Sequence, residues 1–183
     1  MSLILDGSSG TTGNLANGDL QVNGVTVGKG ASTVQYNTVV GITALNANTT
    51  GTDNTAVGWR SLYSNTSGSE NSAFGLNALW TNTTGTDNTG IGTSALGSNT
   101  TGSYNTAVGR LASYVNSTGS NNSSIGYAAL QNNTAGNNTA VGYQASYSNT
   151  TGTANIALGV QALYSNTTGS DNIAIGSYRS EEH

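Results

Sequence analysis

A seventeen-residue unit repeats from Asn37 almost to the end of the chain, and it constrains the fold more than any other feature. Its consensus is Asn-Thr-Ala-Val-Gly-x-x-Ala-Leu-x-x-Asn-Thr-Thr-Gly-x-x, with positions numbered 1 to 17 from the first Asn. A unit this short holds about one turn of a solenoid, too little for a helical hairpin or a propeller blade. The first Asn recurs every seventeen residues, with one step of sixteen, at Asn37, Asn54, Asn71, Asn88, Asn105, Asn122, Asn138, Asn155 and Asn172.

Two glycines per unit favour strands over helices. Position 5 is Gly from Gly41 to Gly176, and position 15 is Gly from Gly51 to Gly169. Each would destabilise a helix by about 1 kcal/mol, whereas turns with positive φ favour Gly. Asn-Thr-Thr-Gly is itself a typical turn sequence. We therefore predict an all-β parallel β-roll or β-solenoid with two short strands and two turns per coil, about 40 Å long at about 4.8 Å per layer.

Two apolar columns predict the interior of the coil. Position 9 is mostly Leu, as in Leu45 and Leu62, and forms one column. Ile156 and Ile173 at position 2 suggest that positions 2 and 4 share the inward face, with the Ala of position 3 outward. Position 4 is apolar in every unit and is the predicted structural core: Val40, Val57, Phe74, Ile91, Val108, Ile125, Val141, Leu158 and Ile175.

The small predicted core indicates self-association. One or two aliphatic side chains per coil bury little apolar area. An outward column of small residues, such as Ala56 and Ala73, would then remain exposed. A closed cyclic homo-oligomer covers every such face at once. The alternative is a self-sufficient monomeric β-solenoid with ordinary terminal caps.

The repeats resemble those of known surface and fibre proteins. Asn54 to Gly58, Asn105 to Gly109 and Asn172 to Gly176 resemble the head repeats of trimeric autotransporter adhesins, which fold as parallel β-rolls. The longer form, Ala162 to Gly169, is similar to repeats in bacteriophage tail fibres, where an endosialidase-type intramolecular chaperone domain often follows. The resemblance spans residues 37–176 and implies an elongated homotrimer. These units are longer than the usual adhesin repeat, which implies a wider coil or a bulged turn.

The ends of the chain differ from the repeats. Residues 1–18 are rich in Gly, Ser, Thr and Asn and predict an extended linker. Residues 19–36 contain alternating apolar residues around Asn23-Gly24, which predicts a β-hairpin leading into the repeats at 37–176. Residues 177–183 drop the repeat, and we expect a truncated end of a longer protein.

Composition argues against several classes of function. The net charge is −4, and the few cations cannot neutralise a run of phosphates, so we expect no nucleic-acid partner. No segment has the roughly twenty apolar residues that span a bilayer, so we expect no membrane insertion. The only His is His183, so the repeats contain no catalytic triad. We expect no catalytic residues, no cofactor and no enzymatic activity.

Acidic residues recur at position 17, at Asp53, Glu70, Asp87 and Asp171. Stacked about 4.8 Å apart, they could form a calcium site or a glycosidase-like carboxylate pair. Since Tyr104, Asn121 and Ala154 continue the column, we favour solvated turn residues and expect no metal site.

Aromatic residues recur at positions 6 and 10. Rings with polar tips suit both sugars and protein interfaces. We take them as candidate glycan or protomer contacts: Trp59, Tyr63, Trp80, Tyr114, Tyr127, Tyr143, Tyr147 and Tyr164. The two Asn columns, from Asn37 and Asn48 onward, predict amide ladders along the stack, so the repeated Asn-x-Thr/Ser sequons need no glycosylation.

These features predict a structural and adhesive module. We expect the distal shaft or tip of a phage tail fibre, located in the virion, that presents a trimeric rod to host-cell surface glycans and multiplies weak contacts by effective concentration. One alternative is a bacterial surface adhesin head. Another is an ice-binding β-solenoid, which thermal hysteresis would reveal. Its binding surface would be the Thr columns, namely Thr49/Thr50, Thr83/Thr84, Thr100/Thr101 and Thr150/Thr151.

Overall fold

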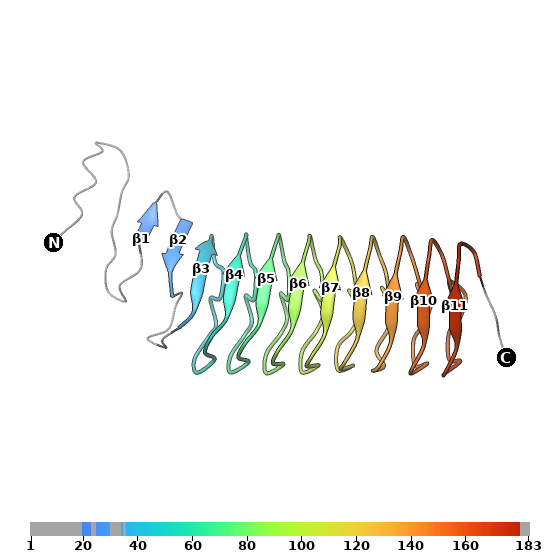
Figure 1. Cartoon of the computed structure of the whole chain (residues 1–183). Helices are drawn as coiled ribbons and strands as arrows, with labels where there is room; N and C mark the ends of the chain where they lie inside the picture. The colour runs from blue at the N-terminus through green and yellow to red at the C-terminus, as the bar shows by residue number, and fades with distance from the viewer. Residues whose placement is uncertain (1–19, 23–24, 30–33, 35, 180–183) are drawn as a thin grey trace.

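The computed structural model describes residues 20–22, 25–29, 34 and 36–179. The expected linker at 1–18, parts of the segment 19–36 and the last residues of the expected truncated end lie outside this range. The described residues contain strands and turns and no helix (Figure 1). The strands are β1 (Leu20–Val22), β2 (Val25–Gly28), β3 (Thr38–Gly41), β4 (Thr55–Val57), β5 (Ser72–Phe74), β6 (Thr89–Ile91), β7 (Thr106–Val108), β8 (Ser123–Ile125), β9 (Thr139–Val141), β10 (Ile156–Leu158) and β11 (Ile173–Ile175).

One sheet runs the length of the molecule, with its strands in chain order (Figure 1). β1 pairs antiparallel with β2, and β2 pairs antiparallel with β3. From β3 to β11 every pair is parallel and offset by one repeat, so that Thr55 lies beside Ser72 and Val57 beside Phe74. The predicted parallel β-solenoid is confirmed, with eight complete coils between residues 37 and 171.

Each coil contains one strand, and the prediction of two strands was wrong. The strand occupies positions 2 to 4, and turns form the rest of the coil. Positions 7, 9 and 17 adopt left-handed backbone with φ between 48° and 63°, as at Arg60, Leu62 and Glu70. Left-handed residues interrupt extended structure, so the Ala-Leu-aromatic segment cannot pair as a strand.

The predicted assignment of the two strand faces was also wrong. Position 3 points inward and is buried, as in Val39, Ala56 and Ala73. Positions 2 and 4 therefore point outward, since side chains alternate along a strand. The predicted core column lies on this outer face: Val57, Val108 and Leu158 are half-buried, and the exposed members are Val40, Phe74, Ile91, Ile125, Val141 and Ile175.

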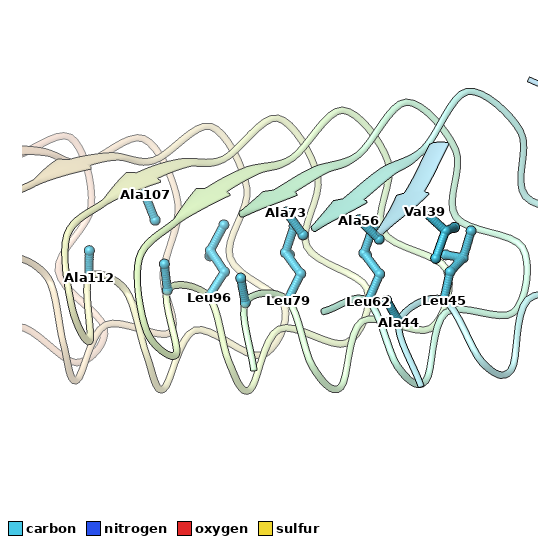
Figure 2. Packing of buried hydrophobic residues seen from close by; sticks show 12 residues of the cluster. Val39, Ala44, Leu45, Ala56, Leu62, Ala73, Leu79, Leu96, Ala107 and Ala112 are labelled. Carbon is cyan, nitrogen blue, oxygen red and sulfur yellow. The ribbon is translucent and has the colours of Figure 1, made fainter. Parts of the chain in front are cut away.

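The leucine column at position 9 is the core that the sequence predicted. Leu45, Leu62, Leu79, Leu96, Leu130 and Leu163 are at most 1% exposed. In Figure 2 the leucines extend from the turn wall of the coil toward the small residues of the strand wall. A Cβ atom added to Gly90 would lie 3.3 Å from Cγ of Leu79, one coil earlier. Leu79 thus fills the space below position 3 of the next coil, which leaves room there for little more than a methyl group.

Two buried asparagine ladders hold the coils in register, as predicted. At position 1 each backbone N–H donates to Oδ1 of the Asn one coil earlier, as from Asn71 to Asn54 at 3.0 Å. At position 12 each Nδ2 donates to the previous Oδ1 in most coils, as from Asn82 to Asn65 at 2.9 Å. Both columns are 6% exposed or less from Asn37 to Asn166. The sequon asparagines of position 12 are therefore structural.

The ladders converge on the glycine at position 15. The carbonyl oxygen of Gly85 accepts a hydrogen bond from Nδ2 of Asn71 at 2.9 Å and from Nδ2 of Asn82 at 3.0 Å. An added Cβ at Gly85 would lie 2.3 Å from the carbonyl oxygen of Gly102 and 2.5 Å from Oδ1 of Asn82. Position 15 thus requires Gly because of close approach. Position 5 needs it for both close approach and a φ between 120° and 157°.

Glycine substitutions test this packing. We expect Gly85→Ala to destabilise the protein by more than about 4 kcal/mol, because a backbone carbonyl cannot move away without breaking the coil register. Gly90→Ala is the matched control, since Ala occupies position 3 in most coils, and its effect should stay within about 1 kcal/mol. Urea unfolding followed by circular dichroism measures both. Equal effects of the two substitutions would contradict the proposed packing.

Removal of one ladder asparagine tests the hydrogen bonds. Oδ1 of Asn88 accepts both the backbone N–H and Nδ2 of Asn105 at 3.0 Å. We expect Asn88→Ala to lower the free energy of unfolding by about 3 kcal/mol or more, because these buried donors lose their acceptor. Asn121→Ala, in an exposed left-handed turn, should cost about 1 kcal/mol. Thermal unfolding of the two variants measures both losses of stability. If Asn88→Ala lowers the free energy of unfolding no more than Asn121→Ala does, the ladder is not a main source of stability.

Candidate binding surfaces

The outer face of the parallel sheet carries a continuous column of exposed and half-buried apolar residues along the described coils. It consists of the outward side chains at positions 2, 4 and 6, and we call it the sheet face. Position 4 contributes an unbroken aliphatic and aromatic column, whose members Phe74, Ile91 and Ile125 are 40%, 41% and 45% exposed. Position 6 adds exposed apolar residues in most coils, namely Ile42, Trp59, Leu76, Tyr127, Tyr143 and Val160.

The sheet face is almost uncharged. Arg110 is the only charged side chain at positions 2, 4 and 6 between Thr38 and Ser177. The acidic residues of the coils all lie at position 17, in the turn before the next strand. A second copy of the same face would therefore meet little like-charge repulsion.

Several candidate aromatic residues stack on one another along the solenoid. The rings of Tyr127 and Tyr143 lie 5.3 Å apart with an interplanar angle of 12°. The rings of Tyr147 and Tyr164 lie 5.2 Å apart at 9°. Offset stacking of this kind stabilises neighbouring layers by about 0.5–1.5 kcal/mol per pair. Stacking also covers ring faces that would otherwise contact a sugar, so these pairs are better suited to hold coils together.

The remaining candidates include both tryptophans, on the second and third coils. Trp59 and Trp80 are 49% and 36% exposed. The guanidinium carbon of Arg60 lies 4.7 Å from the ring centroid of Trp59 and 5.8 Å from that of Tyr63. We call Trp59, Arg60, Tyr63 and Trp80 the tryptophan patch. The Arg60 guanidinium makes no hydrogen bond or ion pair with any residue that the structure describes, so its donors face solvent.

Tyr114 lies apart from these groups, over the glycine of the preceding coil. A Cβ atom added to Gly97 would lie 2.9 Å from the Tyr114 ring. Gly97 replaces the side chain that other coils carry at position 10, and the ring occupies that space. The structure thus separates the eight candidate aromatics into two stacked pairs, one ring over a glycine and the tryptophan patch.

The acidic column at position 17 has a conformational explanation. Asp53, Glu70 and Asp87 adopt φ of 57° to 59°. Asp and Asn tolerate left-handed backbone better than other non-glycine residues, because their short side chains bond locally. Among the described residues, no three acidic or metal-binding side chains come close enough to hold a metal ion.

The threonine columns are engaged within the solenoid. The hydroxyl of Thr83 at position 13 donates to the carbonyl oxygen of Thr100 at 3.0 Å, and that of Thr100 donates to the carbonyl of Ser117 at 2.9 Å. These hydroxyls bridge neighbouring coils at the turn. Position 14, as at Thr84 and Thr101, is exposed.

Comparison of the chain with protein-family models, with curated proteins and with solved structures gives no match. The adhesin-head and tail-fibre resemblance therefore rests on the repeat motifs alone. In the described part of the chain, no helix has the length and apolarity to cross a membrane.

The sequence reasoning missed the sheet face as a surface, although the signal was present. Position 3 holds only Ala, Gly or Ser after Val39. A column kept this small indicates the crowded side of a strand, and aliphatic residues at position 4 are then free to vary in size and shape toward a partner. Val39 is the first residue of the position-3 column. No leucine of an earlier coil lies below it, so this position has room for the larger Val side chain.

A substitution at position 17 tests the conformational explanation. Ala154 holds the same left-handed conformation with φ of 56° and is exposed. We expect Ala154→Asn to stabilise the protein by about 0.5–1 kcal/mol, because Asn tolerates this conformation better. Added calcium should leave the melting temperature unchanged, which differential scanning calorimetry measures. A calcium-dependent rise in melting temperature that is lost in Asp87→Asn would show that the column binds a cation.

Proposed function

We propose that this protein is a structural and adhesive rod, formed by three parallel copies whose sheet faces pack around a common axis. The almost uncharged sheet face, with its unbroken apolar column at position 4, is the observation that carries the proposal. We propose the shaft or tip of a bacteriophage tail fibre as its setting, with a bacterial surface adhesin head as the alternative, on the basis of the repeat motifs. The role is attachment and support, without catalysis.

The size of the sheet face supports association. Nine parallel strands at about 4.8 Å spacing, with about 13 Å between positions 2 and 6, give roughly 500 Å² of flat area. Position 2 is Thr or Ser in seven of the nine coils, so the apolar columns at positions 4 and 6 supply roughly half of this area, near the lower end of the apolar patches of about 300–600 Å² that monomeric proteins expose. Because side chains project from the sheet, the solvent-accessible area of the whole sheet face is larger than this flat area and closer to the roughly 800 Å² per partner of a standard interface.

The repeat favours a parallel assembly. Every copy has the same coil spacing, so parallel copies can place all nine position-4 residues in the same layers. A cyclic arrangement covers each face with two neighbours and leaves no further apolar face for continued growth. The proposed reason for association differs from the one that the sequence suggested. The small residues of position 3 fill the coil interior, and we propose the larger residues of position 4 as the contact surface.

The members of the tryptophan patch outside the sheet face, Arg60, Tyr63 and Trp80, are the best candidates for glycan contact, because Trp59 at position 6 is covered in the proposed assembly. Exposed tryptophan rings can pack on the apolar faces of sugar rings, and the donors of Arg60 suit a carboxylate. These features favour a surface polysaccharide that contains acidic sugars. Three copies per rod would strengthen individually weak contacts through effective concentration. Ice binding is less well supported, because the position-13 hydroxyls donate to backbone carbonyls of the next coil.

The oligomeric state tests the rod. Light scattering should give about 55 kDa, three times the 18.3 kDa chain mass. Ile125→Glu places a charge in the middle of the sheet face and should yield monomers with an unchanged circular dichroism spectrum, because burying an unpaired carboxylate opposes association. Thr84→Glu, on an exposed turn, is the control and should remain trimeric. A monomeric unmodified chain would refute the assembly.

Polysaccharide binding tests the adhesive role. We expect the trimer to bind hyaluronan, whose sugars carry carboxylates, more tightly than neutral dextran, as measured by biolayer interferometry. Tyr63→Ala with Trp80→Ala should weaken binding by about tenfold or more, since each lost aromatic contact is worth about 1 kcal/mol. Tyr164→Ala, from a stacked pair, is the control and should bind normally. Binding that is unaffected by the double substitution would exclude the tryptophan patch.

A further inference from the structure

The buried apolar core is divided into two parts. One cluster extends from Val39 to Ala112 and includes the leucines of the first four coils. The second extends from Ala129 to Ala174 and includes Leu130 and Leu163. The division falls between the fifth coil, 105–121, and the sixth coil, 122–137, which is the coil of sixteen residues. The shortest repeat and the gap in the core therefore coincide.

Two serines replace the apolar contact at this division. Ser113 occupies the leucine position of the fifth coil, and Ser124 occupies the small-residue position of the sixth. Both are buried, and the Ser113 hydroxyl donates to Oγ of Ser124 at 2.9 Å. A hydrogen-bonded serine pair buries less apolar area than the Leu-Ala contact of a consensus coil, so the two coils adhere less strongly.

The turn corner of the fifth coil has lost contacts with the sixth. In a consensus coil, the backbone N–H and the hydroxyl of Thr83 both donate to the carbonyl oxygen of Thr100, at 2.9 and 3.0 Å. Their counterparts at Ser117 donate to no residue that the structure describes. The sixth coil lacks one residue in this turn, and Ala135 takes the place of the position-15 glycine there, accepting from Nδ2 of Asn122 at 2.8 Å.

The position-12 ladder is interrupted at this division, and the side-chain part of the position-1 ladder changes one layer later, between the sixth and seventh coils. Oδ1 of Asn116 is buried and has no hydrogen-bond partner. Nδ2 of Asn133 keeps the consensus bond to the carbonyl at the turn, here that of Ala135 at 2.7 Å, but lacks the second bond, to Oδ1 of Asn116, that would continue the ladder. Nδ2 of Asn138 donates to Oδ1 of Asn133 at 3.1 Å, although the backbone bond from Asn138 to Asn122 is kept at 3.0 Å.

The strand side of the solenoid remains continuous across the division. β7 and β8 pair in the same parallel register as all other coils, with Val108 beside Ile125. The backbone N–H of Thr106 donates to the carbonyl of Asn122 at 2.8 Å, as in a consensus coil. The fifth and sixth coils are thus joined along the sheet and weakly joined at the opposite corner.

We propose that the solenoid consists of two cooperative blocks, residues 37–112 and 129–176, connected by a hinge at the corner between Ser117 and Thr134. The hinge opens at the turn corner while the sheet stays paired, so the rod bends there in preference to other layers. The blocks unfold in separate steps. The hinge depends on contacts within one chain, so the proposal applies to a monomer and to a trimer alike.

Native-state hydrogen exchange of the full chain, followed by NMR, tests the hinge. We expect the amides of Ser117 to Gly119 to exchange about tenfold to a hundredfold faster than those of Thr83 to Gly85. The reason is that Oδ1 of Asn116 and the backbone N–H of Ser117 lack the hydrogen bonds that their counterparts make in a consensus coil. In increasing urea, the amides of each block should exchange in a separate cooperative step.

Two reciprocal variants decide the cause. Insertion of Thr after Thr134, with A135G, S113L and S124A, restores the consensus and should merge the two steps into one. Deletion of Thr84 with G85A and T86G shortens the third coil in the same way, because Gly136 follows Ala135 in the sixth coil, and should speed exchange at Ser67 and Gly68 about tenfold. If the insertion variant does not fold, the deletion variant remains decisive. Equal protection of the Ser117 and Thr83 corners in the unmodified chain, or a single exchange step, would overturn the proposal.

Discussion

The convergence of two buried asparagines on one glycine carbonyl is the interaction on which the rest of the structure depends. Each position-15 carbonyl accepts one hydrogen bond from position 1 and one from position 12 of the same coil, and the asparagine side chains also bond to the neighbouring coil. The glycine has no side chain to keep the layers apart. A chain with few large apolar residues can therefore hold a fixed register, because amide groups specify both the path of the coil and the distance to the next.

This register explains which features the sequence predicted. The period, the parallel stacking, the leucine column and the asparagine ladders follow from residues that recur at fixed positions, and one residue type at each position is enough to identify them. The sequence did not lead to a correct prediction of which strand face points into the coil. Aliphatic residues at position 4 resemble a core column, whereas the burial of position 3 and the closeness of Gly90 to Leu79 show that position 3 faces inward.

The candidate surfaces were predictable to a smaller extent. The aromatic columns at positions 6 and 10 were visible in the sequence, yet their stacking depends on side-chain directions that spacing does not determine. Tyr147 and Tyr164 cover one another, whereas Trp59 and Trp80 stay exposed. The left-handed turns at positions 7, 9 and 17 were also missed, because Leu and Arg do not usually adopt positive φ. The acidic column is explained by those turns.

Disulfide trapping tests the coil register most directly, since the chain has no cysteine of its own. Val57 and Phe74 lie side by side in neighbouring strands. Cysteines at these two sites, about 4.8 Å apart between Cα atoms, fall within the range of a disulfide. Under mild oxidation the account predicts an intramolecular bond between V57C and F74C and none between V57C and I91C, as mass spectrometry of non-reduced peptides detects. Efficient bonding of V57C to I91C, or none to F74C, would contradict the stacking of one repeat on the next.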